Sequence, residues 1–395
     1  MRREWGTRLP NRDNITAVIA KKTFLEFFAG GGMARIGLGD SWQCLLANDL
    51  DPAKCDAYRA NFGDDDIIEG DIRDLSLADL PGGIVDLAWG SFPCQDLSLA
   101  GARGGISAAR SSAFFPFWSL IEKLVAHGRA PRIVTLENVA GLLSSNNGRD
   151  FADIVERMTE AGYYVTASMI DAKSFTPQSR PRLFIIGFAP DLALPEANTP
   201  PSDESTPAAL IAAHDGLSSN ARGRWFWLAP SPTARRYTRL SDIIEWDAPH
   251  WHSPDQTENL IAMMNPRQKH RLDKLIENGA RRAGAAFRRT RVENGISVQR
   301  VEARFDGMAG CLRTPAGGSS RQIIFAVENG AVRSRLLNPR EAARLMGLPE
   351  DYALPENTTA ALKLTGDGVC VPVVRWLAEN VFDPALASAR SQKAA

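Results

Sequence analysis

Residues 22–38 read KTFLEFFAGGGMARIGL, and the fold predicted for the whole chain starts from this stretch. The apolar run 23–28 is typical of a buried strand, and a helical pattern follows the three glycines. Such a turn presents bare backbone N–H groups at the carboxyl edge of a sheet, which suits a nucleotide-like ligand. Arg35 stands where a dinucleotide fingerprint has its third glycine, and no Walker lysine follows. Glycine turns of this kind are also common structural devices without a ligand.

From residue 22 to residue 190, short apolar runs alternate with amphipathic segments. This alternation predicts βαβ units and therefore an α/β fold with a mostly parallel sheet. The expected strands are 23–28, 44–48, 66–69, 84–89, 133–136, 164–170 and 183–188. A helix is expected at 150–161, between the fifth and sixth strands.

The remainder of the chain differs in composition. Residues 194–207 contain four prolines among polar residues, which predicts an exposed linker and a domain boundary. Residues 208–332 hold four tryptophans and much of the arginine, but no sustained alternation that would predict their fold. Helical patterns resume at residue 338 and at 369–380, and the tail 383–395, rich in alanine and serine, is expected to be frayed.

The composition of the 395 residues, with 44% hydrophobic and 23% charged, excludes a disordered or disulfide-scaffold protein and predicts a soluble two-domain one. The N-terminus has no signal-peptide pattern, and no apolar run is long enough to span a membrane. Five cysteines stand far apart without a CxxC pair. They indicate a reducing cytoplasm rather than a zinc ribbon or disulfide framework.

The net charge of zero hides an asymmetry along the chain. Residues 23–100 hold four basic and fourteen acidic residues, whereas residues 265–325 hold thirteen basic and five acidic ones. The basic part could contact a polyphosphate; the alternative is an ordinary solvated surface.

Two aspartates follow strands at the edge where the glycine turn is expected. Asp49 lies nineteen residues after Gly30, at the end of the second strand, where a carboxylate can accept both hydrogens of a ribose diol. Asp71 ends the third strand and could face an adenine amino group. Both could equally serve as turn or helix caps.

A thiol, an acid and two arginines are predicted at the same edge. Cys94 follows the fourth strand in a loop stiffened by Pro93, and a helix starting beyond it would lower the pKa of the thiol. The other four cysteines fit buried apolar positions. Glu137 ends the fifth strand, and Arg180 and Arg182 precede the seventh. Singly these charged residues could be a cap or ion-pair partners; together they could attack, protonate and hold an anionic edge.

In this order, the segments resemble those of the cytosine-C5 DNA methyltransferase family. The resemblance covers roughly 22–190 and 335–380, and leaves the middle unmatched, as the variable target-recognition region of the family would be. The segments that carry it are 28–33 (FAGGGM), 48–51 (NDLD), 70–72 (GDI), 92–95 (FPCQ), 137–139 (ENV), 178–182 (QSRPR), 337–341 (LNPRE) with 346–349 (MGLP), and 366–369 (GDGV).

The resemblance implies a Rossmann-like methyltransferase domain with S-adenosylmethionine as cofactor. The residues implied to bind this cofactor are Phe28, Ala29, Gly30, Gly32, Asp49, Leu50, Asp71, Ile72, Pro93 and Asp367. Asp367 departs from the family, which usually has asparagine there. An acid at that place would favour the ammonium of the methionine end of the cofactor and oppose its carboxylate.

The resemblance also implies the reaction, which is methylation of a cytosine turned out of duplex DNA. Cys94 would add to C6 of the ring, so that C5 can attack the sulfonium methyl group. Glu137 would hydrogen-bond or protonate the N3 edge, and Arg180 and Arg182 would hold O2. Two alternatives are open: a transfer-RNA cytosine methyltransferase, since one relative with these motifs methylates transfer RNA, and a catalytically silent DNA-binding relative.

We expect the DNA contacts to come from two regions. Gly101 to Ser112 resembles the mobile loop of the family, and the basic middle segment is expected to read the bases. The candidate DNA-binding residues are Gln95, Ser98, Arg103, Arg110, Arg288, Arg289, Arg291, Arg313 and Arg321.

The expected domain organisation follows from these assignments. We expect an N-terminal extension 1–21, a catalytic domain formed by 22–195 and 335–382, a target-recognition domain at 208–332 that is smaller and irregular, and a tail 383–395. The partners expected are double-stranded DNA, bound by a monomer, and a cognate restriction endonuclease. No metal site is predicted, because the pair His250 and His252 lacks a third ligand nearby.

Overall fold

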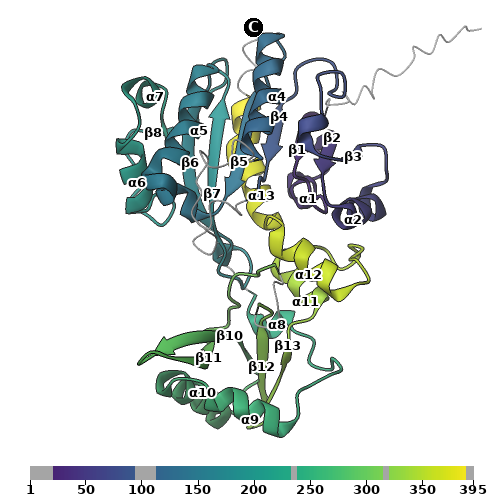
Figure 1. Ribbon diagram of the computed structural model, residues 1–395, viewed down its shortest axis with the longest axis vertical. Coiled ribbons are helices and arrows are strands. Elements are labelled where there is room, and N and C mark those ends of the chain that lie inside the picture. Colours follow the sequence, from purple (N-terminus) through teal and green to yellow (C-terminus); the bar gives the residue numbers. More distant parts are fainter. Residues whose placement is uncertain (1–20, 94–112, 233–237, 315–319, 388–395) are drawn as a thin grey trace, which may run out of the picture.

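The computed structural model describes residues 21–93, 113–232, 238–314 and 320–387. Its large lobe is built around a seven-stranded sheet and its small lobe around a four-stranded sheet, as Figure 1 shows. Two helices lie between the lobes, α11 (Pro339–Leu345) and α12 (Thr358–Asp367).

The seven-stranded sheet has the order β3-β2-β1-β4-β5-β7-β6, in which only β7 runs antiparallel to its neighbours. This arrangement confirms the predicted α/β fold, and each expected strand is present. The strands are β1 (Lys22–Phe27), β2 (Trp42–Asp49), β3 (Ile67–Glu69), β4 (Leu87–Gly90), β5 (Ile133–Asn138), β6 (Tyr164–Asp171) and β7 (Pro181–Phe188).

Helices cover both faces of this sheet because its strands carry apolar side chains on both. Successive side chains of β1 point to opposite faces, so that Phe24 packs into one hydrophobic cluster and Leu25 into the other. The first cluster contains α1 (Met33–Leu38), α2 (Pro52–Phe62) and α13 (Val371–Leu377). The second contains α4 (Phe114–Ala126) and α5 (Arg149–Glu160).

The segment expected to be an exposed linker is partly buried. Ser205 and Thr206 have exposed fractions of 6% and 7%, and the Met169 N–H donates to the carbonyl of Ser205 at 2.8 Å. The short strand β8 (Glu196–Ala197), which lies within this segment, pairs with β9 (Trp227–Leu228). Backbone hydrogen bonds to β6 therefore hold it against the sheet.

Residues 208–229, which we expected in the second domain, pack with the first. They form α6 (Ala208–Asp215), α7 (Ser219–Gly223) and β9, and Leu210 and Ala221 are fully buried in the cluster that contains α5. Their apolar side chains are buried against the large sheet, and the small lobe begins after them.

The small lobe is more regular than the sequence indicated. Its antiparallel sheet has the order β11-β10-β12-β13. The sequence shows no alternation of apolar and polar residues at the β10–β11 hairpin, because both faces of this hairpin carry charged or polar side chains. The elements of this lobe are α8 (Leu240–Ile243), α9 (Pro254–Ala262), α10 (Pro266–Asn278), β10 (Arg282–Glu293), β11 (Ile296–Arg304), β12 (Ile323–Glu328) and β13 (Ala331–Leu336).

The chain returns from the small lobe to the large one through α11, α12 and α13. Helix α13 packs closely on α1 at Gly37, where an added Cβ would lie 2.4 Å from Cβ of Val374. The predicted fraying of the tail is wrong for its first five residues. Residues 383–387 are helical, and Ala385 and Leu386 are buried. These two apolar side chains extend the core formed by α13.

A buried ion pair forms the joint between β13 and α11. The Arg335 guanidinium donates to the Glu341 carboxylate at 2.8 Å, and their side chains are 2% and 0% exposed. Glu341 also accepts hydrogen bonds from the backbone N–H groups of Glu245 and Asn338. The two opposite charges thus compensate each other, as burial requires.

Candidate active site

The carboxyl ends of β1, β2, β4 and β5 meet the amino end of β7 at one edge of the large sheet. In the register of the sheet Phe27 lies opposite Gly90, and Asn138 opposite Leu183. Gln178, just before β7, accepts a hydrogen bond from the Leu312 N–H of the connection between the lobes. This edge therefore faces the region where the two lobes join, which we call the waist. Ligands of open α/β sheets bind at the same edge, outside the carboxyl ends of the strands.

The glycine turn at this edge depends on left-handed backbone. Phe28, Gly30 and Gly32 have φ angles of +57°, +56° and +75°. A Cβ at Gly32 would lie 2.4 Å from Cε2 of Phe62, so only glycine fits there. A Cβ at Gly30 would meet nothing within 4 Å. The turn is thus tight on its protein side and open at Gly30, where a ligand can approach the backbone.

Asp49 is held beside this turn. One carboxylate oxygen accepts from the Gly30 N–H at 2.8 Å and the other from the Asp51 N–H at 2.9 Å. Asp49 is 9% exposed, whereas the next residue, Leu50, is 65% exposed. The site thus has a fixed carboxylate beside an apolar side chain that has no cover, a combination that fits the ribose and the base of a nucleoside.

Asp71 and Ile72 follow β3 at the same edge. Asp71 caps a short 3₁₀ turn by accepting from the Arg73 N–H at 2.9 Å, and Ile72 is buried. The Gly70 N–H donates to the carbonyl of Asp49 at 3.0 Å, which brings the two segments together. The capping role considered for Asp71 is therefore present.

Glu137 and Arg182 meet directly. The Nε atom of Arg182 lies 3.0 Å from Oε1 of Glu137, and their side chains are 15% and 8% exposed. The pairing of β5 with β7 places the two residues on neighbouring strands. A carboxylate and a guanidinium that are largely shielded from water can recognise a flat polar edge with hydrogen bonds of fixed direction.

Arg180 does not join this pair, in contrast to our expectation. One of its terminal nitrogens donates to the carbonyl of Leu312 at 3.2 Å, and the other to Gly366 and Gly368 at 2.9 and 2.7 Å. Its exposed fraction is 2%, and burial lowers the pKa of its guanidinium. Because backbone carbonyls occupy both terminal nitrogens, Arg180 is a positioning residue that holds segments together.

The loop after β4 leads from the same edge to the predicted nucleophile. The Asn138 side chain donates to the carbonyl of Phe92 at 3.3 Å, and Pro93 follows. Cys94, Gln95, Ser98, Arg103 and Arg110 lie outside the described residues.

The buried cysteines of the described residues are poor nucleophiles. Burial raises the pKa of Cys44 and of Cys55 to about 12 and that of Cys370 to about 11. A thiol with such a pKa holds almost no thiolate near neutral pH. Cys311 is partly exposed, and its Sγ atom contacts Arg180 rather than Glu137 or Arg182.

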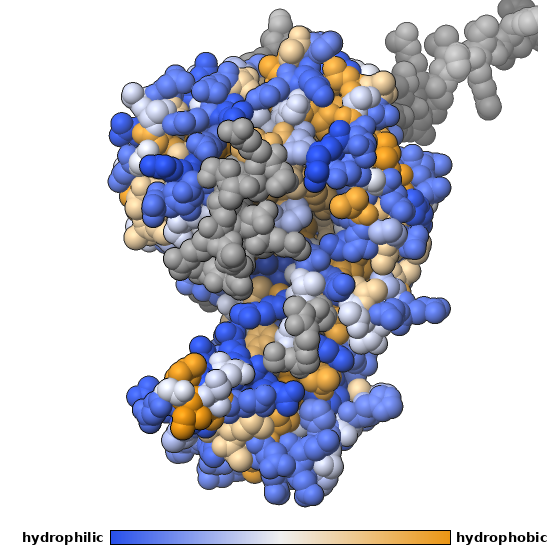
Figure 2. Space-filling model, in the orientation of Figure 1, coloured by the Kyte–Doolittle hydropathy of each residue, from blue (hydrophilic) through white to orange (hydrophobic). Residues whose placement is uncertain are grey.

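The arginines expected to bind DNA lie on different surfaces. Arg289 and Arg291 share one face of β10 and pair with Glu302, Arg289 at 3.0 Å. Arg288 lies on the opposite face, and burial together with its charge lowers the pKa of His252. Figure 2 shows strongly hydrophilic residues along the waist, over the small lobe.

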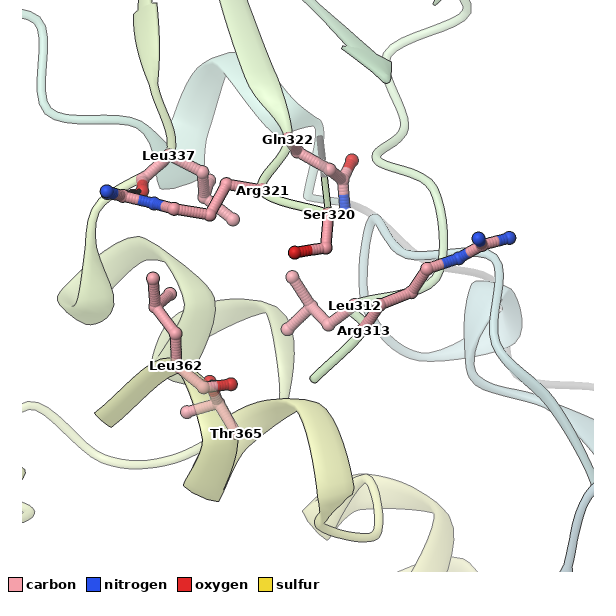
Figure 3. Close-up of a pocket in the computed structure, with 8 residues that line it drawn as sticks. All are labelled: Leu312, Arg313, Ser320, Arg321, Gln322, Leu337, Leu362 and Thr365. Atoms are coloured by element: carbon pink, nitrogen blue, oxygen red, sulfur yellow. Dashed lines mark hydrogen bonds between the residues drawn. The ribbon is translucent and has the colours of Figure 1, made fainter. Parts of the chain in front are cut away.

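The last two candidates line a small pocket between the lobes. Figure 3 shows Arg313 and Arg321 extending from it in opposite directions. Arg313 is exposed and lies over the ring of Phe287 at 5.4 Å. Arg321 donates to the carbonyl of Leu337 at 3.0 Å. Of the two, Arg313 is the one available to an outside partner.

Three residues near the site were not predicted from the sequence. Lys54 pairs with Asp367 at 2.8 Å, and the Tyr352 hydroxyl donates to the carbonyl of Gly31 at 2.7 Å. Glu26 lies 2% exposed in β1, and burial raises its pKa to about 8. Only Glu26 could have been noticed in the sequence, as a charged residue inside the apolar run 23–28. The contacts of Lys54 and Tyr352 join distant parts of the chain and leave no local pattern.

Among the described residues, no cluster of three or more histidine, cysteine or acidic side chains could hold a metal ion. In the same part of the chain, no helix is long and apolar enough to cross a membrane.

Known proteins resemble this chain over most of its length. A family model described as C-5 cytosine-specific DNA methylase matches residues 22–383. The type II methyltransferase M.BsuFI of Bacillus subtilis is 26% identical over 362 residues, which cover 91% of this chain and 72% of that protein. The type II methyltransferase M.HhaI of Haemophilus parahaemolyticus is 25% identical over 363 residues, 91% of this chain and 93% of the relative.

Solved structures share the fold. A mutant of DNMT2 from Spodoptera frugiperda superposes with a TM-score of 0.57 and 16% identity, covering 92% of this chain and 100% of its own. The Dnmt2 methyltransferase of S. pombe gives 0.56 and 16%, covering 92% and 99%.

Proposed function

Since the chain belongs to the C-5 cytosine-specific DNA methylase family, we propose that it transfers a methyl group from S-adenosylmethionine to C5 of a cytosine in double-stranded DNA. The family match confirms the resemblance found in the sequence motifs. The observation that carries the proposed site is the contact of Arg182 with Glu137 at 3.0 Å, beside the loop that continues into Cys94.

Cys94 is the proposed nucleophile. C5 of cytosine is a poor nucleophile while the ring is aromatic, so C5 must gain electron density before it can attack a methyl group. Addition of the Cys94 thiolate to C6 forms a C–S bond and moves the ring electrons toward C5 and N3. After C5 has taken the methyl group, loss of its proton restores the C5–C6 double bond and expels the thiolate.

Glu137 and Arg182 are proposed to hold the cytosine during this addition. The negative charge that moves into the ring collects at N3 and O2, which a protonated carboxyl and a guanidinium can stabilise through hydrogen bonds. Their mutual contact fixes both side chains before the substrate arrives. Such preorganisation avoids the free energy of reorientation during the reaction.

The residues around the glycine turn fit the proposed cofactor. Gly30 leaves open space, Asp49 presents its carboxylate, Leu50 is exposed and apolar, and Asp367 pairs with Lys54 of α2. Phe28, Ala29, Gly32, Asp71, Ile72 and Pro93 complete the proposed set. When bound, the cofactor supplies a methyl group made electrophilic by the positive sulfur.

We assign the DNA contacts to the surface facing the waist. Arg289, Arg291 and Arg313 would neutralise phosphates, and Gln95, Ser98, Arg103 and Arg110 would act from the loop after Cys94. Arg288 and Arg321 are weaker candidates, because the first lies on the other face of β10 and the second bonds Leu337. Residues 22–195 with 335–382 would then be catalytic, and the small lobe would recognise the target sequence.

We further propose that the protein acts as a monomer in the cytoplasm, beside a cognate endonuclease. The relatives named above are type II methyltransferases, which supports such a partner. Co-expression with the neighbouring genes, followed by a digestion assay on unmethylated plasmid, tests for the endonuclease partner.

A mechanism-based trap tests the nucleophile. A duplex containing 5-fluorocytosine cannot lose a proton from C5, so the wild-type protein with S-adenosylmethionine should form a covalent adduct that survives denaturing electrophoresis. Cys94→Ala should abolish the adduct, whereas Cys311→Ala, at a part-exposed cysteine of the described residues, should retain it. An adduct with Cys94→Ala would refute the assignment.

A second assay identifies the substrate. Cofactor labelled in its methyl group is incubated with duplex DNA or with transfer RNA, and the product is digested to nucleosides. We expect 5-methylcytosine in DNA. Label found in RNA alone would replace the proposal by the transfer-RNA alternative, and label in neither would favour a silent DNA-binding relative.

A further inference from the structure

An ion pair joins two segments that lie 313 residues apart in the sequence. Nζ of Lys54, in α2, lies 2.8 Å from Oδ2 of Asp367, the last residue of α12. The other carboxylate oxygen accepts a hydrogen bond from the Thr314 hydroxyl. The side chains of Lys54 and Asp367 remain 20% and 37% exposed.

This pair lies beside the glycine turn. Asp367 is flanked by Gly368, where a Cβ would lie 2.3 Å from the sulfur of Met33, the first residue of α1. Lys54 interacts electrostatically with both Asp49 and Asp51 at the end of β2. The two charges thus lie between the first and second segments of the cofactor site.

The charge of Lys54 is maintained at this place. Burial lowers the pKa of its ammonium, but the charge and hydrogen bond of Asp367 raise it, and the net shift is upward. An ammonium has three donors, of which Asp367 accepts one. Lys54 can therefore bind a second anion without leaving its partner.

The amino-acid end of the proposed cofactor carries both an ammonium and a carboxylate. An aspartate alone at position 367 attracts the first group and repels the second. A lysine beside it supplies the missing positive charge. The pair of side chains is then complementary to both charges of the ligand.

We propose that Lys54 is a specificity-determining residue that binds the cofactor carboxylate while Asp367 binds its ammonium. This inference rests on the proposed function, because it assumes the same cofactor in the same site. A purely structural role for the ion pair, as a link between α2 and α12, is the competing explanation.

Two probes separate these explanations. S-adenosylhomocysteine carries the amino-acid end, whereas 5′-deoxy-5′-methylthioadenosine has the same nucleoside and thioether without it. A structural link would change the affinity for both probes equally. Direct recognition would change the affinity for the first one only.

The experiment is isothermal titration calorimetry of the full chain with each probe. For Lys54→Met we expect a loss of roughly tenfold in affinity for S-adenosylhomocysteine, with the affinity for the second probe unchanged. In Lys54→Met/Asp367→Asn the repelling carboxylate is gone, so the affinity for S-adenosylhomocysteine should partly recover. The matched control is Lys363→Met, an exposed lysine of α12, which should bind both probes as the wild type does.

The outcomes are distinct. If the wild type binds neither probe, the proposed function fails. If the wild type binds both and Lys54→Met weakens both equally, or neither, the role of Lys54 in recognition is refuted while the proposed function stands.

Discussion

At the scale of single residues, the side chains at this site owe their properties to their immediate surroundings. Arg180 and Arg182 are two residues apart, yet backbone carbonyls surround the first and a carboxylate faces the second. Asp49 and Asp71 both accept backbone hydrogen bonds. Residue type therefore indicated which groups could be functional, and neighbouring atoms decided how each one is used.

Glu26 shows the same dependence on surroundings most clearly. It lies beneath the glycine turn, where one of its carboxylate oxygens has no hydrogen-bond partner among the described residues. Burial raises its pKa from 4.5 to about 8, and the opposing charge of Arg35 offsets this only in part. The native protein therefore holds a proton on Glu26 that the unfolded chain releases at lower pH.

This linkage predicts how stability depends on pH. Because the folded pKa is raised, the contribution of Glu26 is fully present below pH 4.5 and is lost as the pH rises toward 8. Within that window the free energy of unfolding should fall by up to about 1.4 kcal/mol per pH unit. Glu26→Gln is neutral throughout and should lack this component. Urea unfolding of both proteins across the window measures it, and parallel profiles would contradict the raised pKa.

At the scale of elements, the short connections after strands form the site. The glycine turn is held from below by Phe62 and Tyr58 of α2 and by the Tyr352 hydroxyl. Its left-handed residues let the chain reverse between β1 and α1 while the Gly30 N–H reaches Asp49. Local sequence and packing by α2 agree here, so the turn was predictable.

Two glycines with positive φ angles test whether packing by α2 restricts the turn. Gly32 and Gly279 both have left-handed backbone, with φ angles of +75° and +65°, but an added Cβ meets Phe62 and Tyr58 at Gly32 and nothing within 4 Å at Gly279. Gly279→Ala should cost about 1 kcal/mol of unfolding free energy from backbone strain alone. Gly32→Ala should cost about 3 kcal/mol or more, since overpacking is added. Equal losses in urea unfolding would mean that the α2 rings move aside.

At the scale of the whole molecule, a few buried polar side chains hold the lobes and the returning C-terminal helices together. Gln178 contacts Leu312 and Leu345, and Arg180 contacts Leu312, Gly366 and Gly368. These contacts connect the edge of the large sheet to α11, α12 and the strand connection of the small lobe. The site is assembled only when all these segments dock.

The two arginines should therefore fail in different ways when they are changed. Arg180→Met leaves the carbonyls of Gly366 and Gly368 without their guanidinium donor, leaves that of Leu312 with the Cys311 thiol alone, and should lower the free energy of unfolding by about 3 kcal/mol or more. Arg182→Lys keeps the charge beside Glu137, so its stability should stay within about 1 kcal/mol of wild type. Loss of the guanidinium should nevertheless slow methylation about 100-fold.

Urea unfolding and single-turnover methylation of duplex DNA measure the two effects. A stable Arg180→Met protein with impaired turnover would return Arg180 to the catalytic group, contrary to the contacts described above.

Much of the large lobe could be predicted because its information is local. Apolar runs and turn residues gave the seven strands, and the carboxyl ends of parallel strands necessarily share an edge. The sequence by itself thus determined the α/β order of the chain and the placing of Asp49, Glu137 and Arg182 at one edge. The small sheet was missed because polar and charged residues occupy both faces of its hairpin.

The tertiary structure alone decided what depends on distant contacts. It separated the role of Arg180 from that of Arg182, packed residues 208–229 on the large sheet, and brought Lys54 to Asp367 across 313 residues of chain. The periodicity of a segment reports which of its faces is buried, and does not report which remote segment covers that face. Partners of buried charges are therefore determined only when the whole chain has folded.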